Sequence, residues 1–160
     1  MCGIAGLLER DGAPADAALA VRMAAAMAHR GPDDSGAFAD GSVAFAHQRL
    51  AVIDVTTGSH QPMTDGDFTI VYNGEVYNFR EIAAELRSLG HEFRSTGDTE
   101  VVLHAFKQWG ADCLKRFDGM FAFAVWNSRE RTLFLARDRF GIKPLYYAQP
   151  GPRFAFASEI

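Results

Sequence analysis

The stretch at residues 120–126, MFAFAVW, limits the fold more than any other part of this chain. Every residue in it is apolar, so both of the faces that alternate along a strand are apolar. A short apolar run of this kind is typical of a strand that is covered on both sides. The sequence therefore predicts a strand held between two layers of structure.

Other short apolar runs, separated by Gly, Pro or Asn, predict further strands. They lie at residues 3–8, 43–47, 50–53, 68–72, 133–136, 145–147 and 154–157, and a loop is expected at residues 30–36. Periodic apolar residues predict helices at residues 15–29, from shortly after Asn78 to Gly90, and at residues 98–109. This mixture indicates an α+β domain with stacked sheets and helices outside.

Composition and charge argue against several classes of protein. The chain has 160 residues, enough for one domain that buries roughly 70% of its unfolded surface. A net charge of −4 and scattered arginines give no reason to expect nucleic acid or an anionic membrane as a partner. The apolar opening is too short for a signal peptide or a membrane span, so we expect a cytoplasmic protein. The two cysteines make no disulfide framework, and the five histidines lack the spacing of a metal site.

Cys2 stands out because of its position. If Met1 is removed, one residue carries both a thiol and a free α-amine. Their ordinary pKa values differ by less than one unit, so moving the proton from sulfur to nitrogen costs only about 1 kcal/mol. An N-terminal amine can then serve as the base for its own nucleophile. Position alone favours the other interpretation, a small structural cysteine at the end of a strand.

Two other features admit both a structural and a functional interpretation. The dipeptide Asn73-Gly74 is the strongest signal for a tight turn, and it directly follows a predicted strand. Backbone N–H groups left unpaired in such a turn could bind an oxyanion. Asp98 stands where the N-cap of the third helix is expected, and capping is its simplest explanation.

Five segments, taken together, resemble the amino-terminal glutaminase domain of glutamine-dependent asparagine synthetase. They are CGIAG at residues 2–6, HRGPD at 29–33, QRLAVID at 48–54, YNGEVYN at 72–78, and RD with GIKPLYY at 137–147. The resemblance extends to FASEI at residues 156–160. It implies an N-terminal nucleophile hydrolase fold, a four-layer αββα sandwich with two antiparallel sheets, in which Cys2 ends a central strand.

The same resemblance implies roles for individual residues. Cys2 would attack the side-chain amide of glutamine, and Asn73 with the N–H of Gly74 would bind the oxyanion. The other residues that it implies would bind substrate. Arg49 would bind the α-carboxylate, Asp98 and Glu75 the ammonium, and Arg30 would help to close the site, with the pocket lined by the backbone of Leu50, Ala51, Val52 and Ile53. Met120 and Ile142 match positions that line the ammonia exit in the family.

Residues 1–160 contain nothing like the Gly-rich pyrophosphate loop of the ATP-using domain in complete synthetases. We therefore expect a single glutaminase domain over residues 1–160, with no cofactor of its own. ATP and magnesium would belong only to the missing synthetase domain. The expected partners are L-glutamine and a synthetase domain or subunit that uses the ammonia, and the oligomeric state, including a homodimer, is left open.

Two alternatives remain. The chain could be the glutaminase half of another amidotransferase, such as those that make glucosamine 6-phosphate or phosphoribosylamine. The Arg-Gly-Pro-Asp loop and the Gly-Ile-Lys-Pro-Leu-Tyr-Tyr segment favour the synthetase type. It could also be a non-catalytic regulatory or docking module, against which the full set of site residues argues.

Overall fold

The structure, a computed structural model that describes residues 1–160, contains nine strands and three α-helices. In chain order these are β1 (Gly3–Glu9), α1 (Ala17–Ala26), β2 (Asp34–Asp40), β3 (Val43–Arg49), β4 (Met63–Asp65), β5 (Phe68–Val76), α2 (Phe79–Ser88), α3 (Asp98–Trp109), β6 (Gly119–Asn127), β7 (Thr132–Arg137), β8 (Tyr146–Ala148) and β9 (Arg153–Ala157). Short 3₁₀ segments lie at Ala28–Arg30, Thr57–Ser59 and Gly110–Lys115.

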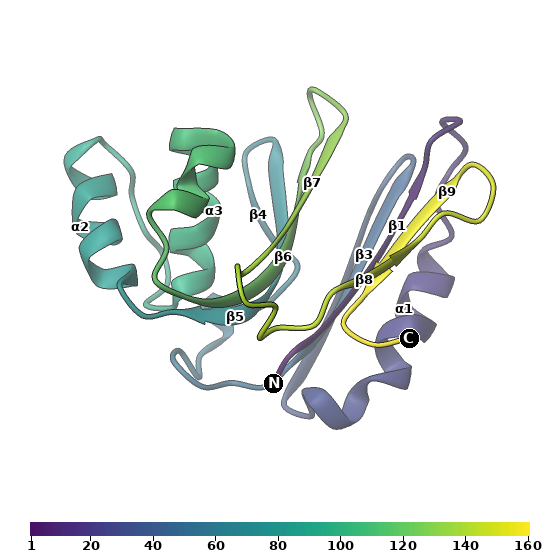
Figure 1. Ribbon diagram of the computed structural model, residues 1–160, viewed down its shortest axis with the longest axis horizontal. Coiled ribbons are helices and arrows are strands. Elements are labelled where there is room, and N and C mark those ends of the chain that lie inside the picture. The colour runs from purple at the N-terminus through teal and green to yellow at the C-terminus, as the bar shows by residue number, and fades with distance from the viewer.

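The strands form two antiparallel sheets that face each other (Figure 1). One has the order β2-β3-β1-β9-β8, and the other has the order β4-β5-β6-β7. Helix α1 covers the outer face of the first sheet, and α2 and α3 lie outside the second (Figure 1). This is the predicted αββα sandwich. None of the helices has the length and apolar character that crossing a bilayer requires.

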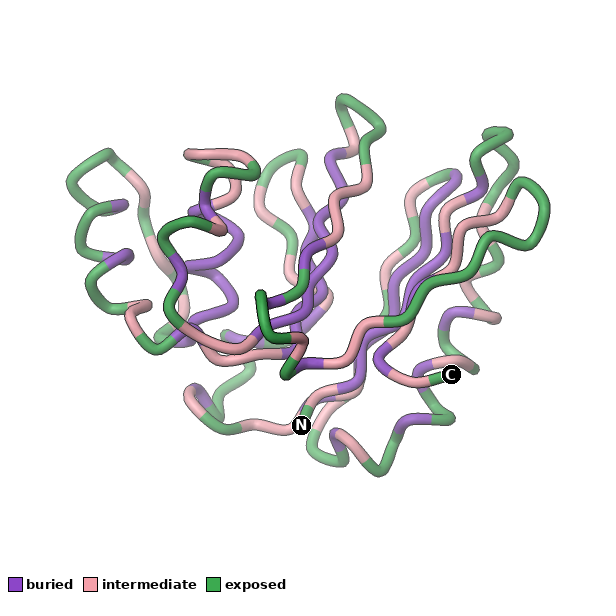
Figure 2. Tube along the Cα trace, in the orientation of Figure 1, coloured by how far each residue is buried: buried purple, intermediate pink, exposed green.

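Strand β6 confirms the prediction made from residues 120–126. Its residues Phe121, Phe123 and Val125 pack toward α2 and α3. The alternate residues Ala122, Ala124 and Trp126 pack into the layer between the sheets. Figure 2 shows the buried chain concentrated in the strands of both sheets. The strand is apolar at every position because it has a hydrophobic layer on each side.

The inter-sheet layer also joins the two sheets through a polar contact. Trp126 is fully buried there, and its indole Nε1 donates a hydrogen bond of 2.8 Å to Asp40 of β2. Ile4 of β1 and Val71 of β5 contribute to the same layer. Strand β5, which carries residues of the site described below, and strand β1, which directly follows another part of it, are therefore held together by this packing.

Several predicted boundaries were wrong. The expected strand at residues 50–53 is an irregular segment, because Arg49 ends β3 and folds the chain back through bonds to the carbonyls of Asp54 and Thr56. The expected loop at residues 30–36 runs into β2, an edge strand that pairs with β3 from Asp34 onward. Helix α1 is shorter than predicted, and a 3₁₀ turn at Ala28–Arg30 replaces its last turn.

The predicted turn at Asn73-Gly74 was also wrong, since both residues belong to β5. The strand continues to Val76 because β6 is long enough to pair with it through Val76 and Gly119. Neither Asn73 nor Gly74 has a positive φ. Glycine is instead required by close approach, because a Cβ at Gly74 would lie 2.6 Å from the carbonyl oxygen of Met120.

Candidate active site

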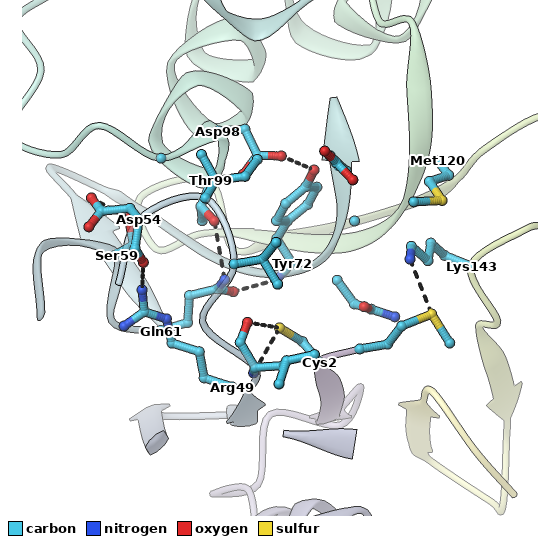
Figure 3. A pocket seen from close by; sticks show the side chains of 18 residues that line it. Cys2, Arg49, Asp54, Ser59, Gln61, Tyr72, Asp98, Thr99, Met120 and Lys143 are labelled. Carbon is cyan, nitrogen blue, oxygen red and sulfur yellow. Dashed lines mark hydrogen bonds between the residues drawn. The ribbon is translucent and has the colours of Figure 1, made fainter. Parts of the chain in front are cut away.

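A cavity of about 230 Å³ opens beside the N-terminal end of β1. It is lined by residues from the chain before β1, the segment after β3, the C-terminal half of β5, the start of α3 and the loop after β7 (Figure 3). The two sheets thus contribute opposite walls. A site of this kind exists only when both sheets are packed together.

Cys2 lies at the base of this cavity, just before the central strand of the five-stranded sheet. Its Sγ accepts a hydrogen bond of 3.4 Å from the N–H of Leu50 and contacts the carbonyl of Leu50 at 3.6 Å. Burial raises the pKa of the Cys2 thiol, although the Leu50 bond and the charge of Arg49 act in the opposite direction. The thiol therefore needs a base to become a nucleophile.

Strand β5 contributes a side-chain donor without a partner to the cavity wall, and a backbone donor lies at the same edge of the strand. The side-chain nitrogen Nδ2 of Asn73 is buried and has no acceptor. The N–H groups of Tyr72 and Val76 point away from β6 and donate to side chains, those of Gln61 and Asp98. Strand alternation places the N–H of Gly74 on this same edge, where β4 no longer pairs with β5. Buried unpaired donors are rare and favour a ligand with a negative oxygen.

Arg49 and Asp98 place opposite charges on the cavity wall. Arg49 is buried and its guanidinium is held by the carbonyls of Asp54 and Thr56, the latter at 2.9 Å. A guanidinium has five N–H donors, so the remaining ones are free to bind an anion.

Asp98 is the first residue of α3, and its side chain does not cap the helix. Gly97 occupies the N-cap position, with no side-chain capping bond. The Oδ2 of Asp98 instead accepts a bond from the hydroxyl of Tyr72 at 2.6 Å (Figure 3) and another from the N–H of Val76 at 3.0 Å. Burial raises the pKa of the Asp98 carboxyl, and both bonds oppose this effect. A ligand cation beside this carboxylate would offset its desolvation.

Comparison with known proteins decides the family. The model of the family described as "Glutamine amidotransferase domain" matches residues 1–160. The chain belongs to this family. The resemblance seen in the sequence motifs is therefore confirmed.

Curated relatives of this amidotransferase domain agree. It is 45% identical over 165 residues to asparagine synthetase [glutamine-hydrolyzing] 3 of Bacillus subtilis, covering 100% of this chain and 27% of that protein. It is 43% identical over 178 residues to a putative asparagine synthetase of Mycobacterium tuberculosis H37Rv, covering 99% of this chain and 27% of the relative. The domain thus spans about a quarter of the length of these relatives.

A solved structure supports the fold. The glutamine phosphoribosylpyrophosphate amidotransferase of B. subtilis, complexed with ADP and GMP, superimposes with a TM-score of 0.81. The match covers 98% of this chain and 41% of that chain, at 21% sequence identity. At this identity the likeness concerns the fold alone.

Most site residues predicted for the amidotransferase domain come together in the cavity. These are Cys2, Arg49, Leu50, Val52, Ile53, Asn73, Gly74, Glu75 and Asp98, together with Met120. Ala51 does not line it, and its N–H donates to the Asp33 carboxylate instead. Ile142 is also outside the lining, with its side chain exposed.

Arg30 lies behind Cys2, outside the cavity lining. Its Nε donates to the carbonyl of Cys2 at 3.0 Å, and its Nη1 bonds Glu159 at 2.8 Å. The structure therefore places Arg30 against the backbone of Cys2. The part in closing the site that the resemblance implies for Arg30 stays a prediction.

Sequence reasoning missed several residues of the cavity lining, among them Gln61, Tyr72, Thr99 and Lys143. Gln61 accepts from the N–H of Tyr72 at 2.7 Å and donates to the hydroxyl of Thr99 at 3.2 Å, so it ties β5 to α3. No local pattern in the sequence predicts these contacts, because they join distant segments. Lys143 also lines the cavity, and its only sequence signal is a cation within the otherwise uncharged segment GIKPLYY.

Proposed function

We propose that this amidotransferase domain hydrolyses L-glutamine to L-glutamate and ammonia through a thioester on Cys2. One observation carries the proposal. The Cys2 thiol shares a cavity with the unpartnered Nδ2 of Asn73, with the strand edge that carries the Gly74 N–H, and with charged groups of both signs. An amide substrate that is also an α-amino acid has the matching groups.

The N-terminal amine supplies the base in this mechanism. Once Met1 is removed, the α-amine of Cys2 takes the thiol proton while Sγ attacks the side-chain carbonyl carbon of glutamine. Asn73 Nδ2 and the Gly74 N–H bind the oxyanion that forms. The amine then returns the proton to the leaving nitrogen, and ammonia departs. Water, deprotonated by the same amine, hydrolyses the thioester to glutamate and restores the thiol.

The charges of the cavity orient the substrate. Arg49 binds the α-carboxylate of glutamine through its free guanidinium donors, as a planar fork suits a carboxylate. Asp98 and Glu75, both on the cavity wall, bind the α-ammonium. This orientation presents the amide end to Cys2. No cofactor takes part in any of these steps.

The relatives indicate the use of the ammonia. They are named asparagine synthetases, and this chain spans about a quarter of their length. We assign residues 1–160 to a single glutaminase domain and its ammonia to a synthetase domain or subunit that uses ATP and magnesium. A reducing cytoplasm suits this role, because the Cys2 thiol has to stay free.

The test combines a measurement of the intact mass of the protein with an assay of glutamate release from glutamine. The expected result is a mass lacking Met1, glutamate released from glutamine, and no release by Cys2→Ala, because that variant has no nucleophile. Cys113→Ala is the matched control, since its thiol is buried away from the cavity. Full turnover by a chain that retains Met1 would contradict the amine mechanism. No turnover by a correctly processed chain would contradict the glutaminase proposal.

A further inference from the structure

Lys143 is a buried cation on the wall of the active-site cavity. The residue is only 5% exposed, and no carboxylate lies within salt-bridge distance of its ammonium. The only hydrogen bond of its side chain runs from Nζ to the sulfur of Met1, at 3.1 Å (Figure 3). Lysine is rarely buried without an anionic partner, because desolvation of its charge is costly. The position therefore calls for a functional explanation.

The loop that carries Lys143 is fixed by one buried carboxylate. Asp138 accepts the backbone N–H groups of Phe140 at 3.1 Å, Ile142 at 2.9 Å and Lys143 at 3.0 Å. It also accepts the N–H of Phe121 in β6, at 3.3 Å. The backbone of Lys143 is thus tied to the second sheet, which fixes the point from which its side chain lines the cavity.

The contact with Met1 locates the ammonium relative to the catalytic residue. Met1 is bonded to the nitrogen of Cys2, and both residues line the same cavity as Lys143. When Met1 is removed, that nitrogen becomes a free amine, and Lys143 loses its sulfur contact. Two groups that can each carry a positive charge then remain on the wall of one cavity. Their repulsion disfavours protonation of the amine, which is the weaker base.

We propose that the Lys143 ammonium holds the α-amine of Cys2 in its unprotonated, basic form in the processed chain. The inference rests on the proposed glutaminase function, in which this amine is the base. At pH 7 a free α-amine with its ordinary pKa is only about 15% unprotonated, and lowering that pKa by one unit would raise this fraction about fourfold. Lys143 acts through its charge and does not need to touch glutamine.

Other charged groups around the amine act in both directions. Arg30 and Arg49 add positive charge from the segment before β2 and from β3. The carboxylates of Glu75 on β5, Asp98 on α3 and Asp138 after β7 oppose them, as does the Cys2 thiolate. Burial lowers the pKa of Lys143, and the Cys2 thiol and Glu75 raise it. Arg30 is ion-paired with Glu159 at 2.8 Å, and Arg49 is the group proposed to bind the substrate carboxylate. Lys143 has neither a carboxylate partner nor a proposed ligand, so its charge remains to act on the amine.

The test is the pH dependence of kcat/KM for glutamine, measured on chains shown by intact mass to begin at Cys2. In Lys143→Met the neutral side chain has similar length, and the acid limb should move upward by on the order of one pH unit. Lys143→Arg keeps the charge and should leave the midpoint within a few tenths of a unit of the wild type. A lower rate with an unmoved midpoint would mean a structural role and would overturn the inference.

A second measurement does not depend on turnover. The rate of Cys2 alkylation by iodoacetamide, followed against pH without glutamine, reports the coupled ionisation of the thiol and the amine. Its midpoint should rise in Lys143→Met and in Lys143→Gln, which is included so that the result does not depend on one variant folding. An unchanged midpoint in a folded neutral variant overturns the inference. If processed wild type releases no glutamate, the proposed function fails, while a shifted alkylation midpoint still supports the effect of Lys143.

Discussion

Asn73 is the residue for which the hydrogen bonding most clearly distinguishes a catalytic role from a structural one. Its side-chain nitrogen is buried, lines the cavity and has no hydrogen-bond acceptor. A donor that stabilises the fold would have a partner, because leaving it unpaired costs free energy. The missing partner is supplied by the oxyanion in the mechanism proposed above.

Asn73→Ala should therefore affect catalysis more than stability. Loss of one oxyanion donor lowers kcat by about 10²- to 10³-fold, with little change in KM, since the ground-state amide oxygen carries less charge. The midpoint of urea unfolding should hardly fall, because no hydrogen bond of the fold is lost. Both quantities are measured by steady-state kinetics and by denaturation on the same preparation.

Asn78→Ala provides the matched control. Asn78 lies outside the cavity, and its amide donates to Arg116 and accepts from Asp118 at 2.9 and 3.0 Å. Its replacement should lower stability and leave kcat close to wild type. If Asn73→Ala behaved in the same way, Asn73 would be structural.

At the scale of elements, the segment after β3 and the segment before α3 are joined by Asp54. Its carboxylate accepts from the N–H of Thr56 at 2.8 Å, the hydroxyl of Ser59 at 3.0 Å and the N–H of Thr96 at 3.1 Å. Its backbone carbonyl also accepts from Arg49. One residue thus fixes both segments and the guanidinium of the substrate site.

The hydrogen bonds of Asp54 also make a pH-dependent contribution to stability. The hydroxyl of Thr56, helped by backbone N–H groups, holds the pKa of the Asp54 carboxyl well below its usual range. Because the folded pKa is lowered, this stability is present above the unfolded value of about 3.9 and is lost as pH falls through the folded pKa.

Asp54→Asn should reduce the free energy of unfolding at pH 7 by about 1–3 kcal/mol. The difference in the free energy of unfolding between wild type and Asp54→Asn should become smaller below pH of about 4. There the wild-type protein begins to lose the stability that ionised Asp54 contributes. Urea unfolding at several pH values measures both effects. A difference that stays constant down to the most acidic condition would mean that the charge of Asp54 is not involved.

At the scale of the whole molecule, the active site is assembled across the two sheets. Cys2 and Arg49 come from the sheet that contains β1, whereas Asn73 and Gly74 come from the sheet that contains β5. The packing between the sheets therefore sets the distance from the Cys2 thiol to Asn73 and Gly74, the proposed oxyanion donors. Small errors in such distances are costly to catalysis.

Two valine substitutions separate this effect from loss of stability. Val71 and Val125 are both buried, but Val71 packs between the sheets and Val125 packs toward the helices. Each change to Ala should destabilise the protein by about 1–2 kcal/mol. Val71→Ala should also lower kcat several-fold, while Val125→Ala should not. Equal effects on kcat would mean that inter-sheet packing does not position the site.

The layered architecture and most residues of the site could be predicted from local patterns and motifs in the sequence. A stable fold has to bury the apolar side chains on both faces of residues 120–126, so this run predicts a strand between two layers. Helix α3 was predicted with its observed bounds because the spacing of its apolar residues is a local pattern. The motifs around Cys2, Arg49, Asn73 and Asp98 named residues that the structure brings together in one cavity.

The ends of the strands and the directions of the polar side chains could not be predicted in this way, because they depend on the packing of distant segments. Asn73-Gly74 has the sequence of a turn, yet the long pairing with β6 keeps it in β5. Asp98 has the position of a cap, yet Tyr72 and Val76 turn its carboxylate into the cavity. Lys143 is far from Cys2 in the chain and reaches its cavity through the fold. These outcomes depend on contacts between distant segments, and a local pattern does not contain them.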